Sequence, residues 1–211
     1  MKAWIISNGQ IKNYDFYRNR IYEEDYIVCA DGGTLHAYRL GITPNVIIGD
    51  MDSMDMDCYN EMAQRKVAIL KHPVQKDQTD TQLAVEHVIK QGCEEIILIG
   101  ALGSRFDHSF ANISLLKMIL DNKRKGMLLD EKNEIYLINK DIKLKGNIGD
   151  ILSLLPVTPE VTGITTTGLY YGLKDAKMEF GIPYGVSNVF IEKEVSISIR
   201  EGLLLVIKSF D

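Results

Sequence analysis

The stretch YIVCADGGTLHAYRLGITPNVIIGD, residues 26–50, places two apolar runs on either side of a polar segment that opens with two glycines. The runs YIVCA (26–30) and NVIIG (45–49) are apolar or β-branched at nearly every position. Strands that are buried on both faces of a parallel sheet have this composition, whereas half-exposed strands alternate apolar and polar residues. The stretch therefore predicts two parallel strands, with a helix that begins after the turn at Gly32 and Gly33.

The same pattern continues on both sides of this stretch. Further apolar runs lie at residues 3–7, 67–70 and 95–100, and helical periodicity covers residues 79–92 and 108–122. In the first of these helices, Thr79 and Gln82 fit a capping box, and Gly92 fits the position just after a helix end. Strands and helices in alternation predict a Rossmann-like α/β domain with a mostly parallel sheet and right-handed crossovers.

The pattern changes near residue 125. From there the helical periodicity fades, and short, often alternating runs are separated by Gly, Pro, Asn and charged turns. Such a pattern is typical of an antiparallel β-sandwich. We therefore expect an α/β domain over residues 1–125, followed by a β-sandwich domain over residues 126–211.

Composition excludes several classes of protein. A net charge of −5 disfavours sequence-independent binding to nucleic acid, which depends on Lys and Arg neutralising phosphates. No apolar stretch approaches the roughly 20 residues of a membrane span, so we expect no membrane association. The three cysteines, Cys29, Cys58 and Cys93, form no CxxC pair and lie far apart. This disfavours a disulfide framework or a zinc site and indicates a reducing cytoplasm.

Polar clusters follow four of the predicted strands. In an open parallel sheet, ligands bind outside the carboxyl ends of the strands, so these clusters should meet at one rim. Aspartates that converge without matching lysines favour a hard cation such as Mg²⁺, which usually shares its ligands with phosphate oxygens. A guanidinium can clamp phosphate, and backbone N–H groups at a glycine turn or a helix start can donate to it. The clusters comprise Asp31, Gly32 and Gly33; Asp50 and Asp52; Asp77, Gln78, Thr79 and Asp80; and Gly103, Arg105, Asp107 and His108.

Each of these residues also has a purely structural explanation. An aspartate after a strand is often a turn residue or a helix N-cap, and we expect Asp55 and Asp57 to open the next helix in this way. In the structural explanation, Asp80 does no more than interact favourably with the positive end of a helix dipole, and Arg105 forms a surface ion pair. The chain contains neither GxxxxGK[ST] nor GxGxxG, which disfavours Walker-type and dinucleotide sites. The coincidence of four strand ends, rather than any single residue, favours a functional site.

Several segments closely resemble the thiamine pyrophosphokinases. They are ADGGTLHAYRLGITPNVIIGDMDS (30–53), KDQTDTQLAV (76–85) and GALGSRFDHSFANISLL (100–116). In addition, TTTGLYYGL (165–173) followed by GIPYGVSN (181–188) resembles the C-terminal thiamine-binding domain of that family. The segments occur in the expected order over most of the chain, and their combination is specific.

The resemblance implies transfer of a pyrophosphoryl group from the co-substrate ATP to the hydroxyethyl group of thiamine, giving thiamine diphosphate and AMP. It implies a homodimer with active sites shared between subunits. By motif match, metal and ATP are carried by Asp31, Asp50, Asp52, Asp77 and Asp80, with Gln78, Thr79, Arg105 and Asp107 beside them, and thiamine by Ser187 and Asn188. Within this set we expect Mg²⁺ on Asp50, Asp52 and Asp80, and catalytic roles for Asp52, Asp80 and Arg105. We expect Gly32, Gly33 and His108 at the ATP site.

Three points stay open at the level of sequence. Some family members stack an aromatic side chain, commonly Trp, on thiamine from a position near the C-terminus, but the single tryptophan here is Trp4. The candidates for that role are Tyr170, Tyr171, Tyr184 and Phe210. The alternative functions are a pyrophosphokinase for another alcohol, such as a 6-hydroxymethylpterin, and a non-catalytic nucleotide or thiamine sensor. The carboxylate that accepts the alcohol proton, with Asp52 as one candidate, is also undecided.

Overall fold

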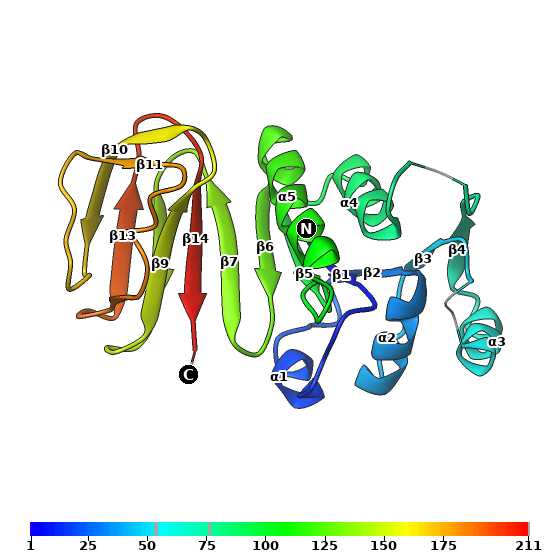
Figure 1. Cartoon of the computed structure of the whole chain (residues 1–211). Coiled ribbons are helices and arrows are strands. Elements are labelled where there is room, and N and C mark those ends of the chain that lie inside the picture. Colours follow the sequence, from blue (N-terminus) through cyan, green and yellow to red (C-terminus); the bar gives the residue numbers. More distant parts are fainter. Residues whose placement is uncertain (53–54, 76, 211) are drawn as a thin grey trace. The chain divides into compact units, whose positions relative to one another are not determined.

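The computed structural model describes residues 1–52, 55–75 and 77–210, and the chain divides into two compact units, Met1–Glu131 and Lys132–Asp211 (Figure 1). The sequence pattern predicted the boundary between the two domains at residue 125. The division lies later because the next strand, β6 (Lys125–Leu129), pairs in parallel with β5 (Glu95–Ile99). That strand therefore belongs to the sheet of the first unit, although the next element in the described part of the chain is a strand and not a helix.

The first unit contains a parallel sheet with the strand order β6-β5-β1-β2-β3-β4. The central strands are buried at nearly every position, which confirms the interpretation of their continuous apolar runs. In the register, Trp4 lies opposite Ile27 on one side and Ile97 on the other. The remaining strands are β1 (Lys2–Ile6), β2 (Tyr26–Ala30), β3 (Val46–Gly49) and β4 (Ala68–Lys71).

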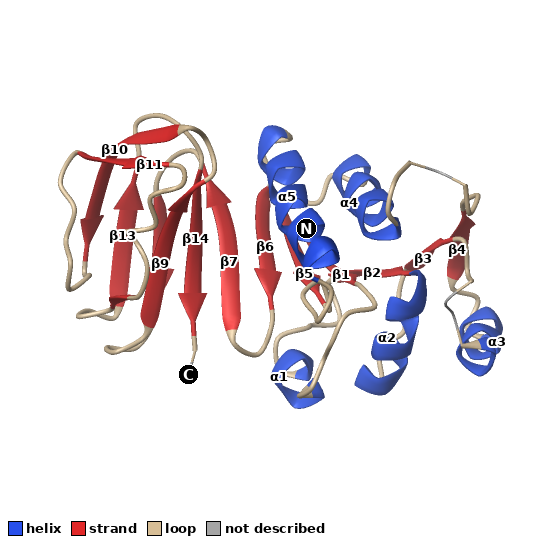
Figure 2. Cartoon of the chain, viewed as in Figure 1, coloured by secondary structure: helices blue, strands red, loops and turns tan. Residues whose placement is uncertain are grey.

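Helices cover both faces of this sheet (Figure 2). On one face, side chains of α1, α2 and α3 join a core that includes Trp4 and Ile6. On the other face, α4 packs against β1, β2 and β3, and α5 packs against β6. The bounds are α1 (Tyr14–Arg18), α2 (Thr34–Leu40), α3 (Met56–Gln64), α4 (Asp80–Lys90) and α5 (Phe106–Asp121), with a 3-10 turn η1 (Asp31–Gly33) before α2.

The ends of two helices follow the sequence signals. The Thr79 side chain accepts the Gln82 N–H at 3.1 Å, and Gly92 follows α4 with a φ of 80°, as predicted. The capping box is only half formed, because the Gln82 amide donates to Glu86 at 3.0 Å instead of returning to the cap. Asp55 caps α3 by accepting backbone N–H groups, which confirms its structural role.

The second unit is the predicted antiparallel sandwich. Its two sheets have the strand orders β12-β9-β14-β7 and β11-β10-β13-β8. Both sheets contribute to one buried cluster, for example Leu154 and Val206 from the first sheet and Ile164 and Val195 from the second. Within the described residues, no helix has both the length and the apolar character needed to cross a membrane. The strands are β7 (Asn133–Ile138), β8 (Ile142–Lys145), β9 (Ile151–Pro156), β10 (Glu160–Thr167), β11 (Ala176–Glu179), β12 (Asn188–Val189), β13 (Glu194–Ser198) and β14 (Leu204–Ser209).

Candidate active site

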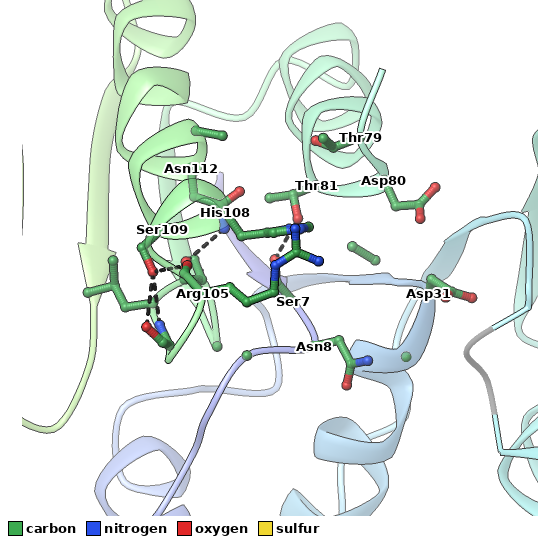
Figure 3. A pocket seen from close by; sticks show the side chains of 18 of the residues that line it. Ser7, Asn8, Asp31, Thr79, Asp80, Thr81, Arg105, His108, Ser109 and Asn112 are labelled. Carbon is green, nitrogen blue, oxygen red and sulfur yellow. Dashed lines mark hydrogen bonds between the residues drawn. The ribbon is translucent and has the colours of Figure 1, made fainter. Parts of the chain in front are cut away.

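A cleft of about 820 Å³ opens at the carboxyl end of the first unit's sheet (Figure 3). Its walls come from the segments after β1, β2, β3 and β5 and from the first turns of α4 and α5. This volume lies in the range of roughly 300–1,000 Å³ that small-molecule sites occupy. Of the residues predicted from sequence, the cleft is lined by Asp31, Gly32, Asp50, Gln78, Thr79, Asp80, Arg105 and His108, and also by Gly103.

Glycines allow the strand ends to approach one another closely at the floor of the cleft. A Cβ atom on Gly33 would lie 2.0 Å from the carbonyl oxygen of Ile6, and one on Gly9 would lie 2.3 Å from that of Gly100. Both distances are far below any real contact, so no other residue fits at either position. The Gly9 N–H donates to the Gly100 carbonyl at 2.6 Å. The end of β1 therefore touches both the η1 turn and the segment after β5.

Asp31, Asp50 and Asp52 each bring one carboxylate oxygen within 4.8 Å of the other two. Asp50 and Asp52 would point to opposite sides of an extended strand. Met51 between them adopts a left-handed conformation, with a φ of 69°, so the chain turns and the Asp52 N–H donates to Asp50 Oδ1 at 3.2 Å. Asp31 itself has a φ of 42°. Non-glycine residues seldom adopt such angles, and those that do concentrate at functional sites.

The chemistry of this aspartate cluster (Asp31, Asp50 and Asp52) fits a hard divalent cation. All of its donors are carboxylate oxygens, which suit Mg²⁺, Mn²⁺ or Ca²⁺, whereas zinc sites draw on Cys and His. Three negative charges at this separation repel one another, and a bound cation would remove that repulsion. The site therefore has both the ligand type and the electrostatic reason to take a metal ion.

Asp80 lies beside the aspartate cluster but is not a member of it. It is the first residue of α4 and lines the cleft. A Cβ atom on Gly49 would lie 2.8 Å from the Cβ of Asp31 and 3.3 Å from the Cγ of Asp80, so both side chains crowd this glycine. The sequence grouped Asp80 with Asp50 and Asp52 as metal ligands. In the structure, Asp31 completes the close group and Asp80 is adjacent to Asp31.

The start of α4 forms another wall of the cleft. Thr79, Asp80 and Thr81 all line it, so the positive end of the helix dipole faces the cavity. The Gln78 side chain also lines the cleft, while its amide donates to Glu86 at 2.7 Å. Such a helix N-terminus is suited to an anionic ligand.

At the start of α5, Arg105 lies at the mouth of the cleft with its side chain 70% exposed. Its guanidinium donates to both oxygens of Asp107, at 2.6 and 3.2 Å. These hydrogen bonds lower the pKa of Asp107 to about 2, so the pair is fully ionised at neutral pH. α5 begins at Phe106, two residues before the start expected from sequence, because Arg105 occupies the cap position. His108 follows in the first turn and also lines the cleft.

Other cleft residues were absent from the sequence prediction. The Ser7 hydroxyl pairs with that of Thr81 at 3.0 Å, and Asn112 donates to the Ala101 carbonyl at 2.7 Å, so both hold neighbouring loops in place. Asn8 and Gln10 line the cleft after β1. Applying the strand-end rule to the first strand as well as the other four would have found them. Conversely, some predicted residues lie outside the lining, namely Gly33, Asp52, Asp77 and Asp107.

The two predicted thiamine residues lie in the second unit, at the start of β12. Ser187 is exposed, has a φ of 59°, and its N–H donates to the Ser153 hydroxyl at 3.1 Å. Asn188 is buried, and its amide is engaged with the backbone of Tyr171: Nδ2 donates to the carbonyl at 2.8 Å, and Oδ1 accepts the N–H at 2.9 Å. Asn188 therefore fixes the position of the exposed Tyr170 and Tyr171 side chains.

Comparisons with known proteins match both units. The family model "Thiamin pyrophosphokinase, catalytic domain" matches residues 17–128, and "Thiamin pyrophosphokinase, vitamin B1 binding domain" matches residues 138–204. The thiamine pyrophosphokinase of Bacillus subtilis is 29% identical over 188 residues, covering 86% of each chain. A crystal structure of the B. subtilis enzyme aligns over 100% of both chains with a TM-score of 0.91 and 25% identity. The structure of the Geobacillus thermodenitrificans thiamin pyrophosphokinase gives a TM-score of 0.88 at 27% identity, covering 100% of this chain and 98% of that one.

Proposed function

The chain belongs to the thiamin pyrophosphokinase family, and on that premise we propose that it transfers the pyrophosphoryl group of ATP to the hydroxyethyl group of thiamine. The products are thiamine diphosphate and AMP. The observation that carries this assignment is the aspartate cluster, with three carboxylate oxygens within 4.8 Å of one another beside a cleft of about 820 Å³. A triphosphate needs such a site for its metal ion.

We assign ATP to this cleft in the first unit. Asp50, Asp52 and Asp80 would hold Mg²⁺, and the proximity of Asp31 to the first two supports its participation. When bound, the ion would supply positive charge that offsets the charge of the triphosphate. The remaining positive partners are the Arg105 guanidinium at the mouth of the cleft and the N–H groups at the turn of Gly32 and Gly33 and at the start of α4. Asp107 holds Arg105 by accepting from its guanidinium. We propose as ATP and phosphate residues Asp31, Gly32, Gly33, Asp77, Gln78, Thr79, Arg105, Asp107 and His108.

The transfer itself requires positioning and charge stabilisation more than covalent chemistry. The thiamine alcohol oxygen forms a bond to the β-phosphorus, and the bond from that phosphorus to the oxygen bridging to the α-phosphate breaks. AMP leaves with the electron pair of the broken bond. The alcohol proton passes to a carboxylate, and Asp52 is our choice because it is the exposed member of the aspartate cluster. Arg105 stabilises negative charge on the phosphates.

For thiamine, we propose the surface of the second unit around Ser187 and Asn188. Tyr170 and Tyr171 are each 66% exposed, and their rings meet edge to face at 4.9 Å. An aromatic face attracts the cationic thiazolium ring of thiamine. Trp4 is only 1% exposed within the core of the first unit, so the candidates for stacking stay Tyr170, Tyr171, Tyr184 and Phe210. We favour Tyr170 and Tyr171, which are more exposed than Tyr184 at 52%.

We further propose a cytoplasmic homodimer in which the active sites are shared between subunits. The second unit exposes several large apolar side chains near the proposed thiamine residues, which supports an interface there. They include Phe180, Ile182, Tyr184 and Val186. The cytoplasmic location is supported by the three cysteines, which are buried and unpaired.

The test is to mix the protein with ATP, Mg²⁺ and thiamine and to measure AMP and thiamine diphosphate. We expect equal amounts of the two products and no AMP when either thiamine or Mg²⁺ is left out. Replacing Mg²⁺ by Mn²⁺ or Ca²⁺ in parallel reactions would establish the preferred cation. AMP formation with a 6-hydroxymethylpterin but not with thiamine would contradict the substrate assignment. Binding of thiamine without any turnover would contradict the enzymatic assignment.

A further inference from the structure

His36 on α2 is a buried histidine whose two ring nitrogens both have partners. The residue is 7% exposed to solvent. Nε2 lies 2.8 Å from the carbonyl oxygen of Gly9, and Nδ1 lies 2.8 Å from the hydroxyl of Tyr14. A carbonyl can only accept, so Nε2 carries the proton, and Nδ1 accepts the proton of the Tyr14 hydroxyl. Arg39 donates to the same hydroxyl oxygen at 3.3 Å. A directed chain of hydrogen bonds therefore runs from Arg39 through Tyr14 and His36 to Gly9.

The neutral imidazole is the form that this chain requires. Burial lowers the pKa of His36, which keeps the ring neutral at pH 7 with one donor and one acceptor nitrogen. The hydrogen of the Tyr14 hydroxyl is then directed at His36, and the hydrogen on His36 is directed at Gly9. Both ring nitrogens of His36 therefore have a hydrogen-bond partner in the neutral form.

Gly9 lies in the loop of residues 7–10, which forms the wall of the cleft after β1. Besides the bond from the Ser7 N–H to the Ile99 carbonyl at 2.9 Å, two sets of contacts hold this loop: the pair between the Ser7 and Thr81 hydroxyls at 3.0 Å, and the N–H groups of Gly9 and Gln10, which donate to the carbonyls of Gly100 at 2.6 Å and Leu102 at 3.3 Å. The first fixes the loop to α4 and the second to the segment after β5. His36 supplies the contact toward α2, on the side of the cleft that carries the aspartate cluster.

The side chain that precedes Gly9 in this loop is that of Asn8. It is exposed in the cleft, and its amide lies over Gly32, where a Cβ atom would come within 2.4 Å of Asn8 Nδ2. In the view of Figure 3, Asn8 is drawn between Arg105 and Asp31. The neighbouring glycine has wide backbone freedom, so its peptide orientation depends on its hydrogen bonds. The carbonyl that accepts from His36 belongs to the peptide between Gly9 and Gln10, so loss of this contact releases that peptide at its carbonyl side and shifts the loop from which the Asn8 and Gln10 side chains enter the cleft.

We propose that His36 is a positioning residue for the nucleotide half of the reaction, acting through the Gly9 carbonyl to hold loop 7–10 in the form that binds ATP. This inference rests on the proposed function, because it assigns the cleft to ATP. His36 itself contacts neither substrate. Its role is to determine where Asn8 stands relative to the triphosphate.

Two substitutions at His36 separate this role from general stability. His36→Gln places an amide N–H near the position of Nε2 and retains the donor to Gly9. His36→Asn keeps a polar atom near Nδ1 for Tyr14 but has no donor that reaches Gly9. In steady-state assays of the full chain, we expect His36→Asn to raise KM for ATP about tenfold, the order expected for one lost hydrogen bond, and to leave KM for thiamine unchanged. His36→Gln should return KM for ATP to near the wild-type value.

The chain contains a matched control. His87 accepts or donates a hydrogen bond at 3.0 Å to the hydroxyl of Tyr26, and burial lowers its pKa as well. This pair lies at the last turn of α4 and the start of β2, at the opposite end of the strands from the cleft. His87→Asn should therefore leave both KM values unchanged. If His36→Asn fails to fold, Tyr14→Phe tests the same chain of hydrogen bonds, with Tyr26→Phe as its control, and should raise KM for ATP by a smaller factor.

A binding measurement separates this inference from the proposed reaction. The probe is α,β-methylene-ATP with Mg²⁺, titrated into each variant by calorimetry. If the wild-type protein forms no AMP, the proposed function fails, but weaker binding in His36→Asn that His36→Gln restores would still support the positioning role. The inference is overturned if His36→Asn binds the nucleotide as the wild type does. It is also overturned if the Gln and Asn variants weaken nucleotide binding equally.

Discussion

Replacing Asp50 by Asn should stabilise the metal-free protein while abolishing its turnover. The carboxylate oxygens of the aspartate cluster lie within 4.8 Å of one another, so each pair of charges repels by at least about 0.9 kcal/mol at the dielectric constant of water and about 3.5 kcal/mol at an effective value of about 20. We use the water-like value as the lower bound, because Asp50 is half-buried and Asp52 is exposed, whereas Asp31 is buried. Asp50→Asn removes two of the three repulsions, and its side-chain oxygen can still accept the Asp52 N–H. The expected gain is about 2 kcal/mol.

Thermal unfolding in EDTA at low salt measures this gain. For a chain of this size, about 2 kcal/mol corresponds to a rise of roughly 4–8 °C in Tm. Because the Debye length falls to about 3 Å in 1 M salt, most of the rise should disappear there. Adding Mg²⁺ should give the wild type the higher Tm of the two proteins, since the wild type binds the ion more tightly and gains more stability from it.

Asp57→Asn is the matched control. Asp57 lies in the first turn of α3, where its charge is favoured by the helix dipole, so its loss should lower stability by about 0.3–1 kcal/mol. The same Asp→Asn change, seven positions further along the chain, is thus expected to change stability in the opposite direction. A fall in Tm for Asp50→Asn, or a rise that 1 M NaCl leaves unchanged, would refute the repulsion argument.

Three further predictions concern other residues of the first unit. Gly49→Ala should lower turnover by about 10²-fold without preventing folding, because its new Cβ would lie 2.8 Å from the Cβ of an aspartate in the cluster; AMP release measures it. In Arg105→Ala, the pKa of Asp107 should rise from about 2 toward 3.8 as the hydrogen bonds that lower it are lost, which NMR titration of the carboxyl carbon would detect. Burial lowers the pKa of both His36 and His87 in the folded state, so the unfolded state binds more protons as pH falls. Stability should therefore be complete above about pH 6.5 and decline below it, and His87→Gln should flatten that decline in urea unfolding at several pH values.

The strands of the first unit could be predicted because strands buried on both faces carry their signal in every residue. The runs at 26–30 and 45–49 became β2 and β3 with almost unchanged bounds. The sequence near residue 125 carried less information. A short apolar run there indicates a strand but not its sheet, and its parallel pairing with β5 is a long-range contact. The change of periodicity therefore preceded the actual division of the chain.

The site could be predicted to the level of loops but not of distances. The strand-end rule brought together the residues after four strands, and most of them line one cleft. Which carboxylates come closest depends on backbone angles that no pattern specifies. Met51 has the left-handed conformation that turns Asp52 toward Asp50, and Asp31 also has a positive φ. Neither position is a glycine, the residue type that most often indicates a positive φ.

Several unfavourable features of the first unit lie together at one rim of its sheet. The mutual repulsion of the aspartate cluster and the positive φ angles of Asp31 and Met51 all occur there. Away from this rim, the central strands are buried in an apolar core that provides the stability to tolerate them. A cation removes the repulsion only when it binds, so its binding energy is coupled directly to the stability of this rim. The same coupling explains why mutations that neutralise the aspartate cluster should stabilise the protein and inactivate it together: the repulsion that weakens the metal-free fold is the source of the affinity for the ion.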